Sequence, residues 1–438
     1  KKSEGDFNEN QATSVLGETQ VYGMTKGGID LGLFALLRYT EKARHTVNLT
    51  GLDAGTEYSY RVGWADRDYW SDVYTFETAP AGESAPFEVL LITDPQGYSK
   101  EAYQRILKVM DKAETVFDDK YSFIINAGDI VEYSSNTTQF DYYFNGLREH
   151  LANTSQVVAV GNHGDSSFDV SKDKEAAFLQ SSESVYTEPY NNVLAHYNFD
   201  LPEQDSVNGA YYSYDYSGVH FTVLNTNDTN DNGLNEGQLN WLKADLAATT
   251  KNHKVVIMHK SIFSAGPHTQ DAEIIGMKQQ LPSIFEEYGV NLVLSGHDHT
   301  YSESYYLDGN GEIIKSANNK TEKIGSKGTL YVSLGTIGDK RYKYQSDSEA
   351  PLYTGAEIHD PYLFNPTFGK LTFDGKDLFY QGYEYDIETD TVNEIKPPFR
   401  LSQTDIILIS VGSAVGAGGI GTGIFFLIKF LKKKKLAA

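Results

Sequence analysis

The sequence contains no cysteine, and this absence limits the chemistry that the chain can perform. Without thiols there is no disulfide framework and no thiolate zinc site, so histidine, carboxylate, amide or tyrosine side chains must hold any metal. Basic residues are also scarce, since 37 Lys and Arg stand against 60 Asp and Glu and the net charge is −23. A surface that neutralises phosphates must be basic, so we expect no nucleic acid as a binding partner.

The two ends of the chain differ in character. The first residues, KKSEGDFNEN, include neither an initiator methionine nor an apolar signal segment, so we expect a fragment or a processed form. Near the other end, residues 406–428 carry no charge, and five lysines follow within residues 429–435. About 20 apolar residues span a bilayer, and a basic cluster after a span marks its cytoplasmic side. We therefore predict a single transmembrane helix at 406–428, a cytoplasmic tail at 429–438 and an extracellular folded part.

The predicted span is rich in glycine, which is common in membrane helices and unfavourable in water-exposed ones. Two GxxxG spacings, Gly412/Gly416 and Gly419/Gly423, are compatible with self-association through this helix.

The N-terminal residues are typical of a small all-β domain. Short alternating runs fill residues 13–79, and Tyr58, Tyr60 and Val62 alternate after a turn rich in Gly and Asp. Regularly spaced short strands of this kind predict a β-sandwich. We assign this domain to residues 1–80, shortened at its start, and read PAGESAP as a linker.

Residues 87–395 have a different pattern. Continuous apolar runs such as FEVLLITD, SFIINAGD, KVVIMHK and VNLVLSGHDH alternate with helical segments such as EGQLNWLKADLA. This alternation predicts a layered α/β domain whose strands are buried on both faces. Polar, irregular segments at 135–155 and 165–200 are expected to form loops or small helices. Together with an irregular loop at 265–280, they are expected to select the substrate.

Several apolar strands of this domain end in polar side chains. These are Asp94, Asp129, Asn162 with His163, His259, and His297 with His299. In α/β sheets, ligands bind beyond the carboxyl ends of the strands, and two residues spaced i and i+2 leave a strand on the same side. Each residue alone has an ordinary explanation as a cap, a turn or a core histidine. Together they predict a metal site.

The order of these motifs resembles the calcineurin-like metallophosphoesterase superfamily. The motifs are TDPQ at 93–96, GDIVEY at 128–133, GNHGD at 161–165, VIMH at 256–259 and GHDH at 296–299. GAYYSYDYSGVHFTVLNT at 209–226 and GTLYVSLGT at 328–336 narrow the resemblance to the purple acid phosphatase branch. The resemblance implies a four-layer α/β/β/α sandwich for residues 87–395 and a fibronectin III-like domain before it.

The resemblance also implies two metal ions, with Fe, Mn or Zn as candidates. Asp129 would bridge both ions. Asp94 and His299 would bind one ion, and Asn162, His259 and His297 would bind the other. The remaining ligand of the first ion is open. The superfamily usually has histidine at the position of Gln96, and the purple branch has tyrosine at the position of Glu132, with Tyr133 one step further on. We expect Gln96 to bind the ion through its amide oxygen or to hold a metal-bound water, and Glu132 to replace the tyrosine as an oxygen ligand.

Two more histidines are candidate catalytic residues. His163 resembles the histidine that protonates the leaving oxygen or stabilises the phosphoryl charge. His268, in SAGPHTQD, falls where the purple branch often has a histidine on the substrate side, although a solvated loop residue is an equal alternative.

The expected function is that of an extracytoplasmic, metal-dependent phosphatase that hydrolyses small phosphate monoesters with a metal-activated water. A phosphodiesterase or nucleotide pyrophosphohydrolase is the alternative on the same site. A surface adhesin with a spent catalytic domain is the alternative without catalysis.

Overall fold

The computed structural model describes residues 12–30, 35–117, 120–132, 137–163, 210–314, 324, 327–343 and 365–395. Within these ranges, no helix combines the length and the apolar character needed to cross a bilayer. The predicted span at 406–428, the tail at 429–438 and the segment 165–200 lie outside the described residues.

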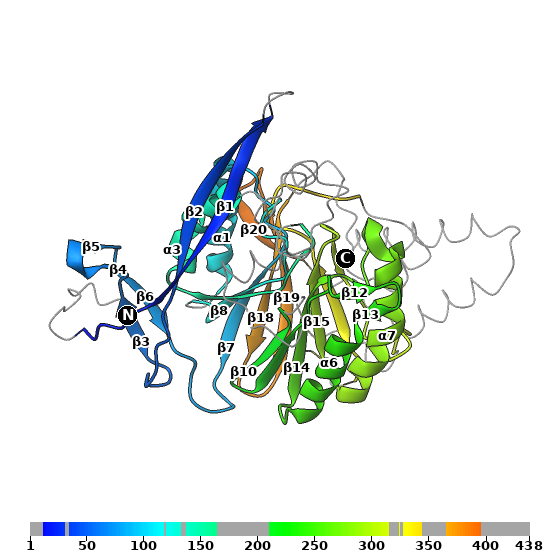
Figure 1. Ribbon diagram of the computed structural model, residues 1–438. Coiled ribbons are helices and arrows are strands. Elements are labelled where there is room, and N and C mark those ends of the chain that lie inside the picture. Colours follow the sequence, from blue (N-terminus) through cyan, green and yellow to red (C-terminus); the bar gives the residue numbers. More distant parts are fainter. Residues whose placement is uncertain are drawn as a thin grey trace, which may run out of the picture. The chain divides into compact units, whose positions relative to one another are not determined.

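Two six-stranded sheets form the centre of the fold (Figure 1). The first sheet has the order β20-β19-β18-β7-β8-β9 and the second has the order β10-β11-β14-β15-β17-β16. In the first sheet, β7 pairs parallel to β8 and β8 to β9, whereas β18 joins β7 antiparallel. In the second sheet, β11, β14, β15 and β17 run parallel. The parallel strands therefore direct their carboxyl ends toward one edge of each sheet.

The strand bounds agree with the apolar runs of the sequence. The first sheet comprises β7 (Phe87–Ile92), β8 (Phe123–Asn126), β9 (Ser155–Val158), β18 (Thr367–Phe373), β19 (Leu378–Asp386) and β20 (Thr391–Ile395). The second comprises β10 (Tyr212–Tyr216), β11 (Val219–Val223), β14 (His253–Lys260), β15 (Leu292–Gly296), β16 (Tyr301–Glu303) and β17 (Leu330–Leu334). A short pair, β12 (Thr229–Asn230) and β13 (Gly233–Leu234), stands apart from both sheets.

Helices cover the outer face of each sheet. α1 (Lys100–Ala113), α2 (Thr137–Gly146) and α3 (Arg148–Leu151) contribute to the core on the first sheet. α6 (Glu236–Ala248) and α7 (Ala272–Tyr288) contribute to the core on the second. The 3-10 turns are η2 (Ala65–Arg67), η3 (Glu114–Val116) and η4 (Pro267–Gln270). The predicted four-layer α/β/β/α sandwich is confirmed.

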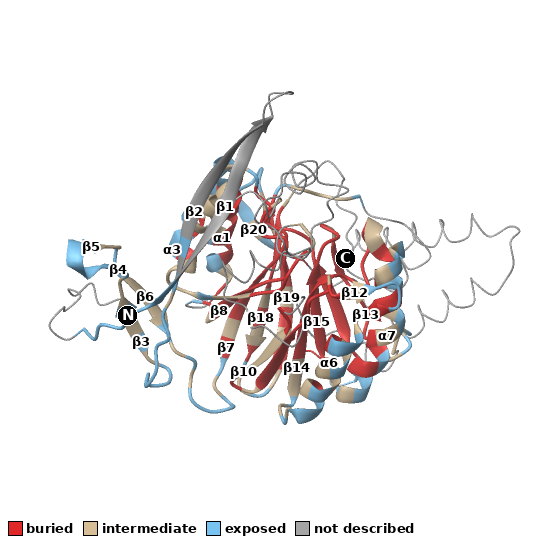
Figure 2. Cartoon of the chain, viewed as in Figure 1, coloured by how far each residue is buried: buried red, intermediate tan, exposed pale blue. Residues whose placement is uncertain are grey.

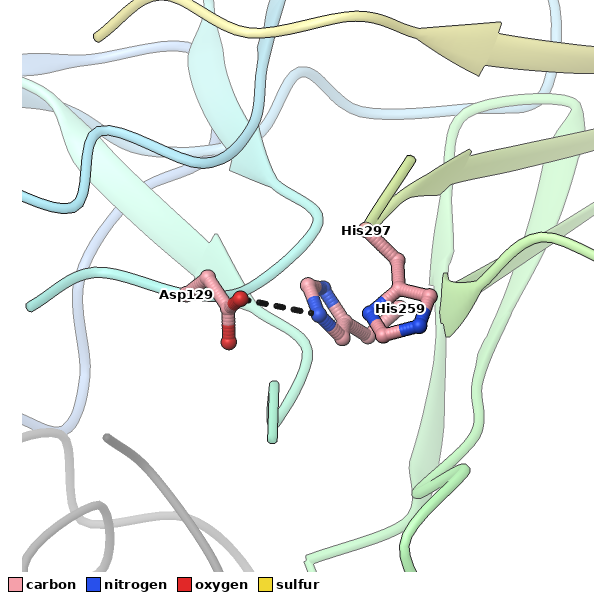
Figure 3. Close-up of side chains that lie close together, drawn as sticks. All are labelled: Asp129, His259 and His297. Carbon is pink, nitrogen blue, oxygen red and sulfur yellow. Dashed lines mark ion pairs between the residues drawn. The ribbon is translucent and has the colours of Figure 1, made fainter. Parts of the chain in front are cut away.

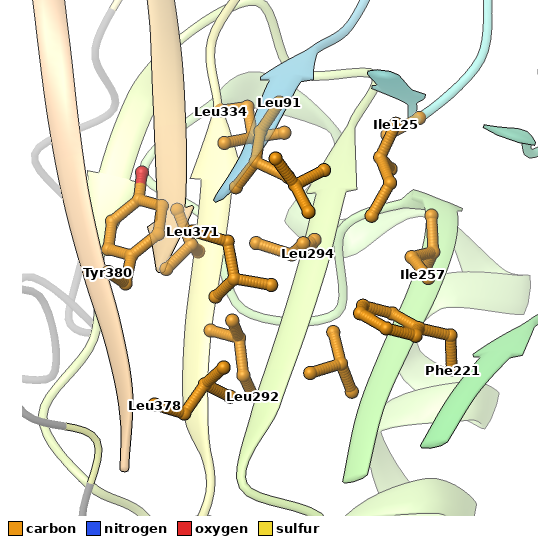
Figure 4. Packing of buried hydrophobic residues seen from close by; sticks show 14 of the residues in the cluster. Leu91, Ile125, Phe221, Ile257, Leu292, Leu294, Leu334, Leu371, Leu378 and Tyr380 are labelled. Atoms are coloured by element: carbon orange, nitrogen blue, oxygen red, sulfur yellow. The ribbon is translucent and has the colours of Figure 1, made fainter. Parts of the chain in front are cut away.

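Strand β7 shows why its sequence is apolar without alternation. Val89 and Leu91 belong to the core between the two sheets, whereas Leu90 and Ile92 pack against the helices of the first sheet. All four side chains are fully buried (Figure 2). Figure 4 shows the inter-sheet core, where Leu91 of β7 and Leu294 of β15 lie among side chains from both sheets. A strand buried on both faces needs an apolar residue at every position.

Two of the segments that were expected to be irregular contain regular helices. Residues 137–151 form α2 and α3, and α7 begins at Ala272, inside the segment 265–280. α7 continues through Pro282 and ends at Gly289, which has left-handed backbone with φ 70°. The small helices α2 and α3 agree with the expectation for 135–155, whereas the expectation of an irregular loop over 265–280 was wrong in part.

The N-terminal residues form three two-stranded antiparallel sheets. Their strands are β1 (Glu18–Asp30), β2 (Ala35–Thr46), β3 (Glu57–Tyr60), β4 (Gly63–Trp64), β5 (Tyr69–Trp70) and β6 (Tyr74–Glu77). The pairs are β1–β2, β3–β6 and β4–β5. Residues 78–86, which include the predicted linker, contain neither helix nor strand. The packing of these pairs into one sandwich stays a prediction.

Candidate metal centre

The predicted ligands gather where the parallel strands end. Asp94 and Gln96 follow β7, Asp129 and Glu132 follow β8, and Asn162 with His163 follows β9. From the second sheet, His259 lies in β14, and His297 with His299 follows β15. Because the two sheets pack face to face, the ends of both sets of strands meet at one place.

One group of possible ligands consists of Asp129, His259 and His297. One ligand atom from each lies within 4.8 Å of the others, and all three residues are buried (Figure 3). His259 Nε2 lies 3.2 Å from Asp129 Oδ2 and 3.0 Å from Asn162 Oδ1. The structure thus brings together all the residues predicted for the second ion.

A second group consists of Asp94, Asp129 and His299, which are again buried and again within 4.8 Å of one another. His299 Nε2 lies 3.2 Å from Asp94 Oδ1. Asp129 belongs to both groups, as a carboxylate that binds two neighbouring ions must.

Backbone carbonyls set the orientation of two of these histidines. His259 Nδ1 donates to the carbonyl of Ala127 at 2.8 Å, and His299 Nδ1 donates to the carbonyl of Lys340 at 2.9 Å. A carbonyl only accepts, so each Nδ1 carries hydrogen and each Nε2 faces the carboxylates. This is the arrangement by which outer partners fix a metal-binding histidine.

The buried negative charge of Asp129 in the first group needs a positive charge to balance it. Burial lowers the pKa of His259, but the charge of Asp129 and the hydrogen bond to it outweigh burial and raise that pKa to about 9. Burial raises the pKa of Asp129, and His259 reverses the effect and holds it well below its usual range. Burial and the charges of His259 and His268 depress the pKa of His297. A proton on His259 therefore balances Asp129, and a metal ion would displace it.

Residues with strained backbone are concentrated around the metal centre. Nine non-glycine residues have positive φ in the described part of the chain, and five of them are candidate ligands. These five are Asp94 (φ 50°), Gln96 (φ 36°), Asp129 (φ 51°), His297 (φ 72°) and His299 (φ 48°). Left-handed backbone at non-glycine residues is costly and clusters at functional sites. The bond from Gln96 N to the carbonyl of Asp129, at 3.0 Å, helps to hold this conformation.

The residues present fit two metal ions. Asp94 Oδ1 and Gln96 Oε1 are buried and have no hydrogen-bond partner, which is costly unless a cation satisfies them. A Cβ at Gly161 would collide with Asp129, so the glycine of GNHGD lets the two strand ends approach. Carboxylate, amide and imidazole ligands together suit Mn, Fe and Zn.

The family profile described as Calcineurin-like phosphoesterase matches residues 87–301. The profile described as Purple acid Phosphatase, N-terminal domain, matches residues 2–78. Residues 87–301 are therefore a calcineurin-like metallophosphoesterase domain. Purple acid phosphatases of this family use a dinuclear centre of iron, zinc or manganese, and the two ligand groups around Asp129 match that requirement.

Similar proteins agree with this assignment. The metallophosphoesterase is 25% identical over 305 residues to Purple acid phosphatase 15 of Arabidopsis thaliana, covering 64% of this chain and 53% of that protein. It is 24% identical over 307 residues to Purple acid phosphatase 23 of the same plant, covering 64% and 62%. The chain thus spans less than two thirds of either relative. A purple acid phosphatase from yellow lupin (Lupinus luteus) seeds shares the fold, with a TM-score of 0.61 at 16% identity over 86% of this chain and 69% of that chain.

The open ligand position of the metallophosphoesterase has one candidate inside the centre. Gln96 Nε2 donates to Asp129 Oδ2 at 3.0 Å, so its amide oxygen is the atom without a partner. Glu132 belongs to neither ligand group. Its carboxylate lies 3.8 Å from His163 Nδ1 and 3.6 Å from Lys340 Nζ. Tyr133 lies outside the described residues. Ligation by Gln96 or Glu132 stays a prediction.

Both candidate catalytic histidines lie at the edge of the centre. The backbone N–H of His163 donates to Asp129 Oδ1 at 2.8 Å, and one third of its side chain is exposed. The ring of His268 lies 4.3 Å from that of His297 between centroids. His268 is held by Asp271 at 2.9 Å, and its backbone N–H donates to Asp298. His268 is therefore not a remote loop residue.

Sequence reasoning missed the segment after β17, where Lys340, Arg341 and Tyr342 enter the site of the metallophosphoesterase. The ring of Tyr342 lies 4.6 Å from that of His299. The Arg341 guanidinium bonds to the carbonyls of Gly338 and Lys340, and burial lowers its pKa to about 10. Burial lowers the pKa of Lys340 too, but Glu132, Tyr342 and Asp129 together outweigh burial and the net shift of the pKa is upward. The available signal was that IGDKRY, too, follows an apolar strand.

Proposed function

We propose that this metallophosphoesterase hydrolyses phosphate monoesters at a dinuclear metal centre. The observation that supports this most strongly is the shared carboxylate, since Asp129 joins both ligand groups. A centre of this kind binds the attacking and the leaving oxygens of a phosphoryl transfer between two ions.

Each side chain has a distinct role in this proposal. Asp94, Asp129 and His299 hold one ion, with the oxygen of Gln96 completing the set. Asn162, His259 and His297, together with Asp129, hold the other. When bound, the ions supply Lewis acidity that activates a water molecule and neutralises phosphoryl charge.

The histidines at the edge supply the remaining chemistry. His163 lies beside the carboxylate that both groups share, and its exposed ring can give a proton to the leaving oxygen. His268 lies beside His297, where it can donate a hydrogen bond to the substrate. Its bond to Asp271 sets the orientation of the ring.

The same centre supports a phosphodiesterase or a nucleotide pyrophosphohydrolase, and the test must separate these activities. The adhesin alternative finds less support. A spent site has no reason to keep five buried ligand residues, four of them in left-handed backbone.

The test uses the purified protein loaded with Mn, Fe or Zn. We expect about two ions per chain, turnover of p-nitrophenyl phosphate, and slower turnover of bis(p-nitrophenyl) phosphate. Asp129→Asn is the matched control and should lose both metal and activity. Faster turnover of the diester would favour the phosphodiesterase, and turnover of neither ester by a metal-loaded protein would revive the adhesin.

We also infer that the catalytic domain works outside the cell on a C-terminal anchor, with iron, manganese or zinc as its metals. The support is the uncharged segment 406–428 and the lysines after it. The full chain should sediment with membranes, and protease added to intact cells should digest the catalytic domain. Protection of that domain in intact cells would show that the topology is the reverse of the one proposed. A full chain that stays soluble would contradict the anchor and its GxxxG contacts.

A further inference from the structure

The side chain of Lys340 reaches the centre from the segment that follows β17. Its Nζ lies 3.4 Å from Nε2 of His163 and 3.6 Å from Oε2 of Glu132. The ammonium also lies 5.8 Å from the centroid of the Tyr342 ring. About one third of the side chain, 32%, is exposed, so Lys340 is not enclosed in the core.

The backbone at Lys340 is tied to the ligands. Its carbonyl accepts the hydrogen bond from His299 Nδ1 at 2.9 Å and a second bond from Arg341 at 3.1 Å. Earlier in the segment, Thr336 Oγ1 donates to the carbonyl of Asp94 at 2.7 Å. The lysine therefore has a fixed position relative to both sheets, and a side-chain substitution leaves the bond from His299 to the main chain in place.

The ammonium retains donor capacity for a ligand. A lysine has three donors, and the ammonium of Lys340 uses one of them in a side-chain hydrogen bond with Tyr342. The contacts of Lys340 with His163 and Glu132, at 3.4 and 3.6 Å, are longer than the usual range of about 2.7–3.2 Å. A phosphoryl oxygen offers a shorter, charge-assisted bond. Glu132 faces this ammonium and belongs to neither ligand group, so it acts as a counterion.

The charges near Lys340 indicate which substrates this lysine would favour. Asp94, Asp129 and Glu132 bring three carboxylates to the strand ends of one sheet. A phosphate monoester enters as a dianion near neutral pH, because its second pKa lies near 6, whereas a diester carries one negative charge. A fixed cation beside the leaving-group histidine stabilises the dianion more than the monoanion.

We propose that Lys340, held in place by Glu132, binds a phosphoryl oxygen of the substrate and so selects dianionic monoesters over monoanionic diesters. This inference rests on the proposed phosphatase function and assigns a determinant of its specificity. Lys340 contacts the substrate in this proposal, and Glu132 is a positioning residue.

The test compares kcat/KM for p-nitrophenyl phosphate and for bis(p-nitrophenyl) phosphate in the metal-loaded protein. Loss of one donor to developing phosphoryl charge costs about 10²–10³-fold in comparable sites. We expect Lys340→Met to lose about that much for the monoester and about tenfold or less for the diester. Lys340→Arg should keep the preference in large part. Lys343→Met, an exposed lysine three positions on, is the matched control and should change neither value.

Two further measurements keep the proposal falsifiable. Binding of orthophosphate to the metal-loaded protein should weaken in Lys340→Met with two ions retained. Glu132→Gln should shift the monoester-to-diester ratio in the same direction with both ions kept. Loss of an ion in Glu132→Gln would identify Glu132 as a ligand and overturn its role here.

The outcomes separate this inference from the proposed function. An unchanged monoester-to-diester ratio in Lys340→Met overturns the inference while the phosphatase stands. If the native protein hydrolyses neither ester, the phosphatase proposal fails. The binding of orthophosphate is then the one measurement that tests whether Lys340 binds an anion. Weaker binding in Lys340→Met would support the anion site, and equal binding would overturn it.

Discussion

The side-chain amide of Gln96 donates a hydrogen bond of 3.0 Å to Oδ2 of Asp129, the carboxylate that both ligand groups share. This bond fixes which end of the amide faces which neighbour, because only its nitrogen can donate to a carboxylate. The oxygen, Oε1, is left buried without a partner. Gln96 therefore orients the shared carboxylate, and its oxygen is the atom that we propose for the ion that Asp94 would hold.

Replacing Gln96 should weaken the binding of one metal ion. Gln96→Leu removes the oxygen and the hydrogen bond together, and loss of such a partner typically lowers metal affinity by about 10–100-fold. Gln96→His should restore binding, since imidazole is itself a ligand. Metal analysis after dialysis against a weak chelator measures the effect. Gln381→Leu, in β19, is the control; equal metal loss in both leucine variants would contradict a specific role for Gln96.

Single-ligand variants should remove the two ions separately. His297→Ala should lower the occupancy of the site formed with His259, and His299→Ala should lower the occupancy of the site formed with Asp94. Of the two groups that share Asp129, each of these histidines belongs to only one. Hydrolysis should fall by more than about 100-fold in either variant, beyond the loss typical of an outer partner. Metal stoichiometry measures the result. Two ions and normal turnover in either variant would remove that histidine from the centre.

His163→Ala should keep both ions and slow turnover. The ring lies outside both ligand groups, whereas its backbone N–H, which the variant retains, bonds to Asp129. General acid catalysis contributes about 10²–10⁴-fold. Substrates with an acidic leaving group need less proton donation and should be less affected. A series of aryl and alkyl phosphates tests this, and equal losses across the series would argue against proton donation.

His220 should make stability depend on pH. It lies between Asp215, at 2.7 Å, and Asp245, at 3.0 Å, and links β11 to α6. Burial lowers the pKa of His220, but the hydrogen bonds to the two aspartates outweigh it and raise the pKa above 6.5. The stabilisation is therefore complete below the unfolded pKa of about 6.5 and is lost as pH rises through the higher, folded value.

The corresponding experiment compares the native protein with His220→Asn by urea unfolding. The native protein should be more stable by about 1–3 kcal/mol at slightly acidic pH, and the difference should shrink at alkaline pH. His253→Asn is the control, because His253 bonds to the carbonyl of Lys376 rather than to a carboxylate. A difference that grows with pH would contradict the assignment.

The sequence predicted the parts of this fold whose pattern is local. Strand β7 is apolar without alternation from Val89 to Ile92 because both of its faces are buried there, and α6 was predicted as a helical segment. Helix α7 was missed because Gly276 and Pro282 interrupt its pattern. The glycine has a packing reason: a Cβ at Gly276 would collide with the backbone of Gly233 in β13. Such a contact between distant segments leaves no local signal.

The candidate site divides in the same way. Asp94, Asp129, His259, His297 and His299 were predicted because each is polar and closes an apolar strand. The distance between Lys340 and His163 could not be predicted, since it depends on how the two sheets face each other. The direction of the Glu132 side chain could not be predicted either, because it is set by the contact of Glu132 with Lys340. The role of Glu132 as a ligand of the first metal ion therefore stays a prediction.

The pairing of β18 with β7 has a consequence for folding kinetics. Gly369 pairs with Leu91 and Phe373 with Phe87, so the chain from residue 93 to residue 366 must loop out before this part of the sheet closes. Contacts of such high sequence separation form slowly, and a nascent chain that has not reached β18 leaves an edge of β7 open to aggregation. Asp94 lies two residues beyond β7. We therefore expect metal capture to be a late step of maturation, completed after synthesis of the domain.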